Sequence, residues 1–179
     1  MNDKFLRAIN RIPFFAPLLL YISAFAALFA QLQIFRALIR EINGWLTIAP
    51  LTTAGDVALI MIPFVLLHPR WRWMVWLAIG GFTAFCYVNL WYCRAFYDLM
   101  PADSLGMGGN MQSRVIDAFF DQLRYSDWTL LLPVLAFAVI WMLLRRHQAD
   151  KKFPLWCKIT ISAASLLLYC AAYMVRCYN

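Results

Sequence analysis

The chain has 179 residues, of which 64% are hydrophobic and 14% are charged, and its formal net charge is +7. Soluble domains are about half apolar and about a quarter charged, so this composition excludes an ordinary soluble domain. The positive charge is concentrated in some of the links between long apolar runs. It therefore indicates a membrane topology and gives no reason to expect a nucleic-acid partner. We expect an all-α, polytopic membrane protein that forms a single domain.

Five apolar runs approach the length of about 20 residues that a helix needs to cross the hydrocarbon layer. They cover about 13–35, 46–67, 71–93, 127–144 and 154–175. The second run contains Asp56, and a charge near the middle of a membrane costs about 2.5–3.5 kcal/mol. Two interpretations stay open. Asp56 caps a helix that begins late, or it points into the bundle and pairs with a cation such as Arg94.

The basic residues predict an orientation. Ten of the 16 Lys and Arg residues lie in the N-terminal segment, the 68–72 link and the 145–158 link, which five crossings would place on one side. They are Lys4, Arg7, Arg11, Arg70, Arg72, Arg145, Arg146, Lys151, Lys152 and Lys158. Cytoplasmic loops retain cations during insertion, so we expect a cytoplasmic N-terminus and an external C-terminus. The first apolar run is longer than the core of a signal peptide, which favours a retained membrane helix.

The first external link is short: Arg36, Arg40 and Glu41 would form it, and Asn43-Gly44 would mark a turn. The third apolar run ends in a string of polar and aromatic residues and opens into a loop with Pro and Gly. The motif residues are Asn89, Tyr92, Arg94, Asp98 and Asn110.

Arg94 and Asp98 are four residues apart, so on a helix they share a face and can pair. The buried amide of Asn89 would bond to a neighbouring helix. An alternative is an aromatic belt at the interface with an exposed ion pair.

The link that follows the third run has a helical pattern of its own. Asn110 would cap a helix over about 111–124, with apolar residues at helical spacing on one face and charged residues on the other. The apolar face contains Ile116, Phe119, Phe120 and Leu123. Such a helix would lie in the outer interface of the membrane or pack against a soluble partner. Both arrangements use the same face, so the periodicity does not separate them.

The chain has five cysteines and no CxxC pair. Small, polarizable packing residues are one interpretation of them. A disulfide between Cys93 and Cys177 is the other, because both would lie at the external ends of their helices, where a bridge can persist.

No catalytic site is expected in these residues. Metal-dependent phosphoryl transfer needs several Asp, Glu or His ligands and a nucleophile in one place. The two histidines, His68 and His147, both belong to the predicted cytoplasmic links. We therefore predict no metal site and no cofactor within this chain.

The motif at 89–110, together with Ser126-Asp127, resembles the segment after the third membrane helix of the lipoteichoic acid synthase family. Members of that family have an Asn, an Arg five positions on, an Asp nine on and a further Asn, which correspond here to Asn89, Arg94, Asp98 and Asn110. The resemblance covers the whole chain in layout and about 89–128 in motif. It implies five membrane helices in a bacterial plasma membrane, with an amphipathic external helix before the fourth.

The resemblance also implies an external catalytic domain of the sulfatase and alkaline phosphatase superfamily. The family's Thr nucleophile and its metal site, for manganese or a similar divalent ion, lie in that domain and match nothing here. The chain would then be the membrane portion of a longer phosphoglycerol transferase, or a shortened relative. Its expected work is to anchor the enzyme, orient a lipid substrate and contact the catalytic domain, in cis or in trans.

In that site Arg94, with Asn89 and Asp98, would hold the phosphate of an anionic phospholipid through forked hydrogen bonds. A non-enzymatic membrane scaffold is the alternative function. A small transporter subunit is a third.

Overall fold

The computed structural model describes residues 15–43, 50–68, 71–97, 99, 121–148 and 153–178. Within these ranges the chain is helical, with turns and no strand, so the all-α prediction is confirmed for the part described. The long helices are α2 (Phe15–Asn43), α3 (Pro50–Leu66), α4 (Met74–Phe96), α6 (Leu132–Gln148) and α7 (Leu155–Tyr178). A 3-10 helix, η3 (Tyr125–Leu131), leads directly into α6.

Four segments of the described chain are long and apolar enough to cross a membrane: Phe15–Ile42, Met74–Phe96, Tyr125–Leu144 and Leu155–Arg176. The remaining apolar helix, α3, has 17 residues. Many large apolar side chains on these helices face outward, such as Leu135 on α6 and Leu167 on α7, which are 59% and 71% exposed. Hydrocarbon chains would cover such faces, and these are the properties of a helical membrane protein.

Several helices extend beyond their predicted ends, and two of these extensions bear on the site. Helix α2 continues to Asn43, so Arg36, Arg40 and Glu41 are helical and form no link. The extension has a physical reason, because Leu38 and Ile39 on the same stretch are buried in the core. Helix α4 continues to Phe96, where Tyr97 takes a left-handed conformation with φ of 58° and donates its N–H to the carbonyl of Cys93. This arrangement closes the last turn of α4.

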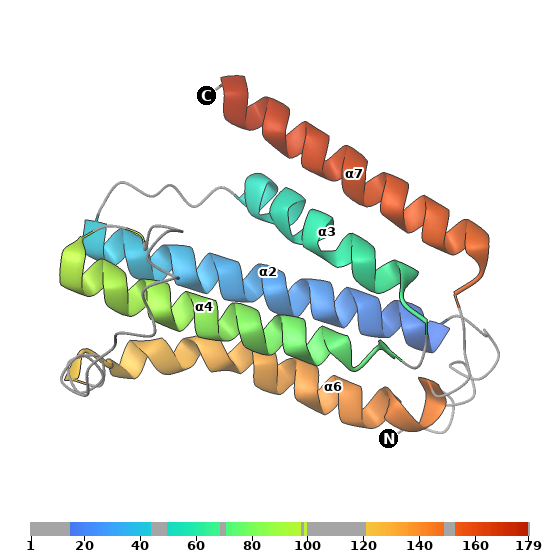
Figure 1. The fold of residues 1–179 in the computed structure, drawn as a ribbon, viewed down its shortest axis with the longest axis horizontal. Helices are drawn as coiled ribbons and strands as arrows, with labels where there is room; N and C mark the ends of the chain where they lie inside the picture. The colour runs from blue at the N-terminus through green and yellow to red at the C-terminus, as the bar shows by residue number, and fades with distance from the viewer. Residues whose placement is uncertain are drawn as a thin grey trace.

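Consecutive helices run in opposite directions, and α2 lies in the middle (Figure 1). Helices α3, α4 and α6 each contact α2, whereas α7 packs mainly against α3. One end of the bundle holds the last turn of α4, the first turn of α3 and η3; we call it the Arg94 end. The opposite end holds the turn before α4, the end of α6 and the start of α7; we call it the Arg72 end.

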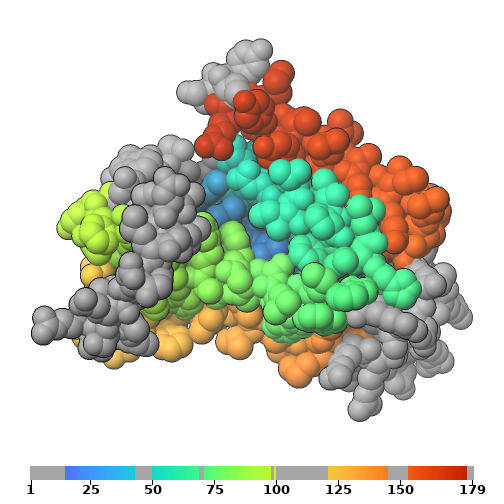
Figure 2. Space-filling view, in the orientation of Figure 1, coloured from blue at the N-terminus to red at the C-terminus, as the bar shows by residue number. Residues whose placement is uncertain are grey.

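Helices α3 and α7 approach each other closely at Gly55. A Cβ atom on this residue would lie 2.6 Å from the Cβ of Ala172 and 3.3 Å from the Cα of Tyr169. Small residues at such a crossing let two membrane helices pack backbone to backbone. The side of α3 that faces α4 is less closely packed. Figure 2 shows α2 in blue at the floor of a hollow between α3 and α4.

Candidate functional site

Arg94 lies in the last turn of α4, and its guanidinium forms a bidentate ion pair with Asp127 of η3. The Nη1–Oδ2 distance is 2.6 Å and the Nη2–Oδ1 distance is 2.5 Å. The pair is almost fully buried, with 7% of the Arg94 side chain and 1% of the Asp127 side chain exposed. The two residues are 33 positions apart in the sequence. Their contact therefore fixes the start of η3 against the end of α4.

Further hydrogen bonds surround this pair. Arg94 Nη1 also donates to the carbonyl of Gln122 at 2.7 Å, and the backbone N–H of Arg124 donates to Asp127 Oδ2 at 2.9 Å. The hydroxyl of Tyr87 on α4 donates to the carbonyl of Asp127 at 2.9 Å. Because both charges are paired and hydrogen-bonded, the pair is tolerated where an isolated charge would not be.

A cavity of about 200 Å³ lies beside the ion pair. Glu41 and Ile42 of α2, Arg94 and Tyr97 of α4, and Arg124 line it. The Arg124 side chain is exposed and has no ion pair with any residue that the structure describes. Arg94 already uses three of its five N–H donors on Asp127 and Gln122. Of the two arginines, Arg124 is thus the more available for an anion.

A second polar cluster joins α2 to α3 at the same end of the bundle. Arg36 pairs with Asp56 at 3.2 Å and donates to the hydroxyls of Thr52 and Thr53 at 3.2 and 2.6 Å. Helix α3 begins at Pro50, so Asp56 lies in its second turn and does not cap the helix. It points toward α2 and pairs with a cation, as the second interpretation held, but that cation is Arg36 and not Arg94. Arg36 reaches it because α2 extends beyond its predicted end.

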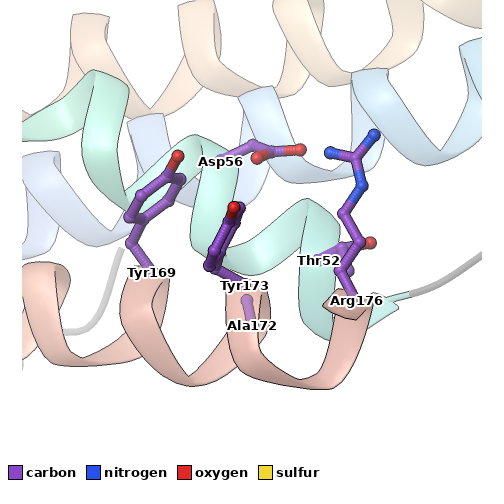
Figure 3. A pocket seen from close by; sticks show the side chains of 6 residues that line it. All are labelled: Thr52, Asp56, Tyr169, Ala172, Tyr173 and Arg176. Atoms are coloured by element: carbon purple, nitrogen blue, oxygen red, sulfur yellow. The ribbon is translucent and has the colours of Figure 1, made fainter. Parts of the chain in front are cut away.

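A small pocket opens next to Asp56, between α3 and α7. Figure 3 shows the side chains of Asp56 and Arg176 projecting to the same side of it, with two tyrosines alongside. Thr52, Asp56, Tyr169, Ala172, Tyr173 and Arg176 line this pocket. Its enclosed volume is about 20 Å³, which is room for a water molecule and not for a headgroup.

Three other residues that the sequence singled out lie on α4 near the ion pair. Asn89 is buried, and its Nδ2 donates to the carbonyl of Phe85 on its own helix at 3.0 Å. Tyr92 packs against Phe96 with 4.5 Å between ring centroids. Cys93 is buried in the cluster that contains Leu38 and Leu130. The side chain of Cys177 is outside the described residues, so the Cys93–Cys177 bridge stays a prediction.

Much of the predicted external segment is also outside the described residues. This applies to Asp98 and Asn110 of the motif and to Ile116, Phe119 and Phe120 of the predicted interfacial helix. At the end of that helix, Asp121 is helical and residues 122–124 are not, so the predicted end at 124 was wrong. Leu123 is 36% exposed. The carbonyl of Gln122 and the N–H of Arg124 instead bind the ion pair.

Sequence reasoning missed a polar contact in the middle of the bundle. Gln31 of α2 is fully buried and donates to the hydroxyl of Thr83 on α4 at 2.6 Å. Gln31 also approaches the carbonyl of Leu130 at 3.4 Å, so one amide joins α2, α4 and η3. A glutamine in the middle of an apolar run was the available signal, because such amides usually bond between membrane helices.

Within the described residues, no group of three or more His, Cys, Asp and Glu side chains could hold a metal ion. The described site can hold two segments together and offer a cation to an anion. Comparison of the chain with protein-family models, with curated proteins and with solved structures finds no match. The resemblance to lipoteichoic acid synthases therefore depends on the sequence motif alone.

Proposed function

We propose that the chain is the membrane domain of a lipoteichoic-acid-synthase-like phosphoglycerol transferase, or of a transferase for a similar headgroup. It would anchor that enzyme and orient its lipid substrate. The observation that supports the proposal most is the buried Arg94–Asp127 pair. Arg94 and Ser126-Asp127 are separate parts of the sequence motif that carries the resemblance. The fold brings Arg94 and Asp127 into contact.

In this proposal all five long helices cross a bacterial plasma membrane, α3 included. The N-terminus is cytoplasmic, and the Arg94 end and the C-terminus face the exterior. The distribution of charge supports this orientation, since the 68–72 and 145–158 links belong to the Arg72 end and are basic. The link that contains residues 99–126 then leaves the membrane on the external side. There it would contact a sulfatase-like catalytic domain, in cis or in trans, and that domain would hold the divalent metal.

The geometry moves the expected phosphate contact from Arg94 to Arg124. Arg94 is a positioning residue, since Asp127 and Gln122 occupy three of its donors. Arg124 would bind the phosphate of an anionic phospholipid headgroup in the cavity that it shares with Tyr97. A guanidinium suits this task because its planar fork matches two phosphate oxygens.

The test measures binding of a soluble short-chain phosphatidylglycerol to the purified chain by calorimetry. We expect Arg124→Gln to weaken binding about tenfold, as for the loss of one charged hydrogen-bond pair. Arg40→Gln is the control, because Arg40 is also exposed at this end and is not among the residues that line the cavity. Equal affinity of the two variants, or equal binding of short-chain phosphatidylcholine, would remove the headgroup site from the proposal.

One observation favours the second candidate function, a non-enzymatic membrane scaffold. Both carboxylate oxygens of Asp127 accept hydrogen bonds from Arg94, so the pair holds two segments together and does not need a ligand. A scaffold predicts that Arg94→Ala lowers stability and that no phospholipid is bound selectively. Sequencing the coding DNA beyond the codon for Asn179 separates the two functions further, since an open frame into a sulfatase-like domain favours the transferase.

A further inference from the structure

The Arg72 end of the bundle contains a buried arginine whose neighbours in sequence are exposed. Trp71 and Trp73 are 53% and 51% exposed, and their rings stack on each other with centroids 6.4 Å apart. Arg72, between them, is only 8% exposed. Tryptophans at a helix end usually mark the membrane interface, and an arginine there usually extends to water. Here the aromatic rings face outward and the cation faces the bundle.

The Arg72 side chain lines an apolar crevice. Leu20 and Ala24 of α2 and Met61 and Phe64 of α3 are part of its wall, and Arg72 and Val75 border it on the α4 side. The same three helices border the hollow that Figure 2 shows. The crevice runs from the cation toward residues deeper in the helices. Its polarity is that of a lipid, with charge at the interface and hydrocarbon inside.

The shape of the crevice restricts what can occupy it. Its enclosed volume is about 20 Å³, so it does not enclose a compact organic molecule. An acyl chain would therefore lie along the open side of the crevice and would not be enclosed by it. The burial of Arg72 lowers its pKa from the usual value, because the charged form loses water. An arginine nevertheless stays protonated in proteins, so Arg72 brings a positive charge to the border of the crevice.

The rest of this end is also basic. Arg145 and Arg146 belong to the last turns of α6, and Lys158 belongs to the first turn of α7. Lys158 donates to the carbonyl of Leu66 at the end of α3 at 3.1 Å, which places its charge close to the crevice. Basic pockets between membrane helices bind anionic headgroups.

We propose that an anionic phospholipid binds at the Arg72 end, with its phosphate on Arg72 and one acyl chain along the crevice between α2, α3 and α4. The site is distinct from the cavity beside Arg94, which belongs to the opposite end of the bundle. It does not depend on the proposed transferase function, but it does require that the helices lie in a bilayer. In the orientation proposed above, the lipid belongs to the cytoplasmic leaflet.

The test uses the full chain in phosphatidylcholine nanodiscs that contain a small fraction of phosphatidylglycerol with a photoreactive acyl chain. After illumination, mass spectrometry locates the cross-linked peptides. We expect cross-links on the peptides that contain Leu20 and Met61, and about tenfold fewer in Arg72→Gln, for the loss of a charged hydrogen-bond pair. Arg40→Gln is the matched control, since it removes one positive charge at the opposite end and should label as the wild type does.

Competition on the wild-type chain keeps the test decisive if Arg72→Gln fails to fold. Unlabelled phosphatidylglycerol should displace the probe from the crevice peptides, whereas phosphatidylcholine and inorganic phosphate should not. Displacement by inorganic phosphate would show a free-anion site and overturn the lipid assignment. Cross-links spread evenly over the outward faces of α6 and α7, or equal labelling by a phosphatidylcholine probe, would show non-specific lipid contact and would also overturn it.

Discussion

Replacing Asp127 by Asn removes one charge of the buried pair and leaves the Arg94 guanidinium without its counter-charge. The Arg94 side chain is 7% exposed, so water cannot replace the carboxylate. Removing one partner of a buried ion pair costs about 3–5 kcal/mol. Hydrogen bonds between membrane helices are worth much less, about 0.6 kcal/mol on average. The predicted loss for Asp127→Asn therefore lies well above that of an ordinary interhelical contact.

Reversible unfolding in mixed micelles, followed by tryptophan fluorescence, measures this loss, because the chain has 8 tryptophans. Asp121→Asn is the matched control, since Asp121 is exposed and six residues away, and it should change stability by less than about 0.5 kcal/mol. The double variant Arg94→Met/Asp127→Leu should recover most of the loss, because it leaves no buried charge. A cost below about 1 kcal/mol for Asp127→Asn, or no recovery in the double variant, would refute the reasoning.

Three further changes test the packing around the site. Gly55→Ala should destabilise the protein by about 1–3 kcal/mol, because its Cβ would meet the Cβ of Ala172 at 2.6 Å. Gly80→Ala is the control, since a Cβ there has nothing within 4 Å, and it should be neutral or stabilising in the same unfolding assay. Equal effects of the two substitutions would contradict the close α3–α7 crossing. Tyr87→Phe should cost about 0.5–1.5 kcal/mol through the lost hydrogen bond to the Asp127 carbonyl. A cost equal to that of Asp127→Asn would contradict the view that the ion pair contributes more to stability than this hydrogen bond. Arg36→Gln should cost less than Asp127→Asn, since 37% of the Asp56 side chain is exposed and water can solvate it; the reverse order would show that the Arg36 cluster is the main polar contact of this end.

Run length and hydrophobicity predicted where the long helices lie, because backbone N–H and C=O groups inside a membrane must form hydrogen bonds within the chain, and an apolar helix provides them. The helix ends were less predictable. A polar residue near the end of an apolar run ends the apolar stretch without ending the helix, and Arg36 is an example. Its place on α2 then decided the partner of Asp56. The sequence indicated that Asp56 needed a cation, but not which one, because that choice depends on helix length and rotation.

The Arg94–Asp127 pair was not predicted, although both residues were singled out. Sequence spacing favoured Asp98 for Arg94, because local pairs four residues apart on a helix are the ones that spacing reveals. The partner on η3 is 33 positions away and becomes visible only when α4 and η3 are placed together. A single Asp at the start of one span and a single Arg at the end of the preceding span, on the same side of the membrane, was the available signal. The burial of Arg72 had no signal in the sequence, where two tryptophans and an arginine are typical of an exposed interface.

The proposed function requires that consecutive helices cross the membrane in alternating directions and place the Arg94 end outside. Single cysteines introduced at Arg40, His68 and Leu99, in a chain whose natural cysteines are replaced by serine, test this directly with a membrane-impermeant maleimide. All three positions are exposed in the structure, the first and third at the Arg94 end and the second at the Arg72 end. We predict that intact cells label positions 40 and 99, and that position 68 reacts only after permeabilisation. Labelling of position 68 from outside, or of all three from one side, would contradict the topology, and with it the external position of the Arg94–Asp127 site.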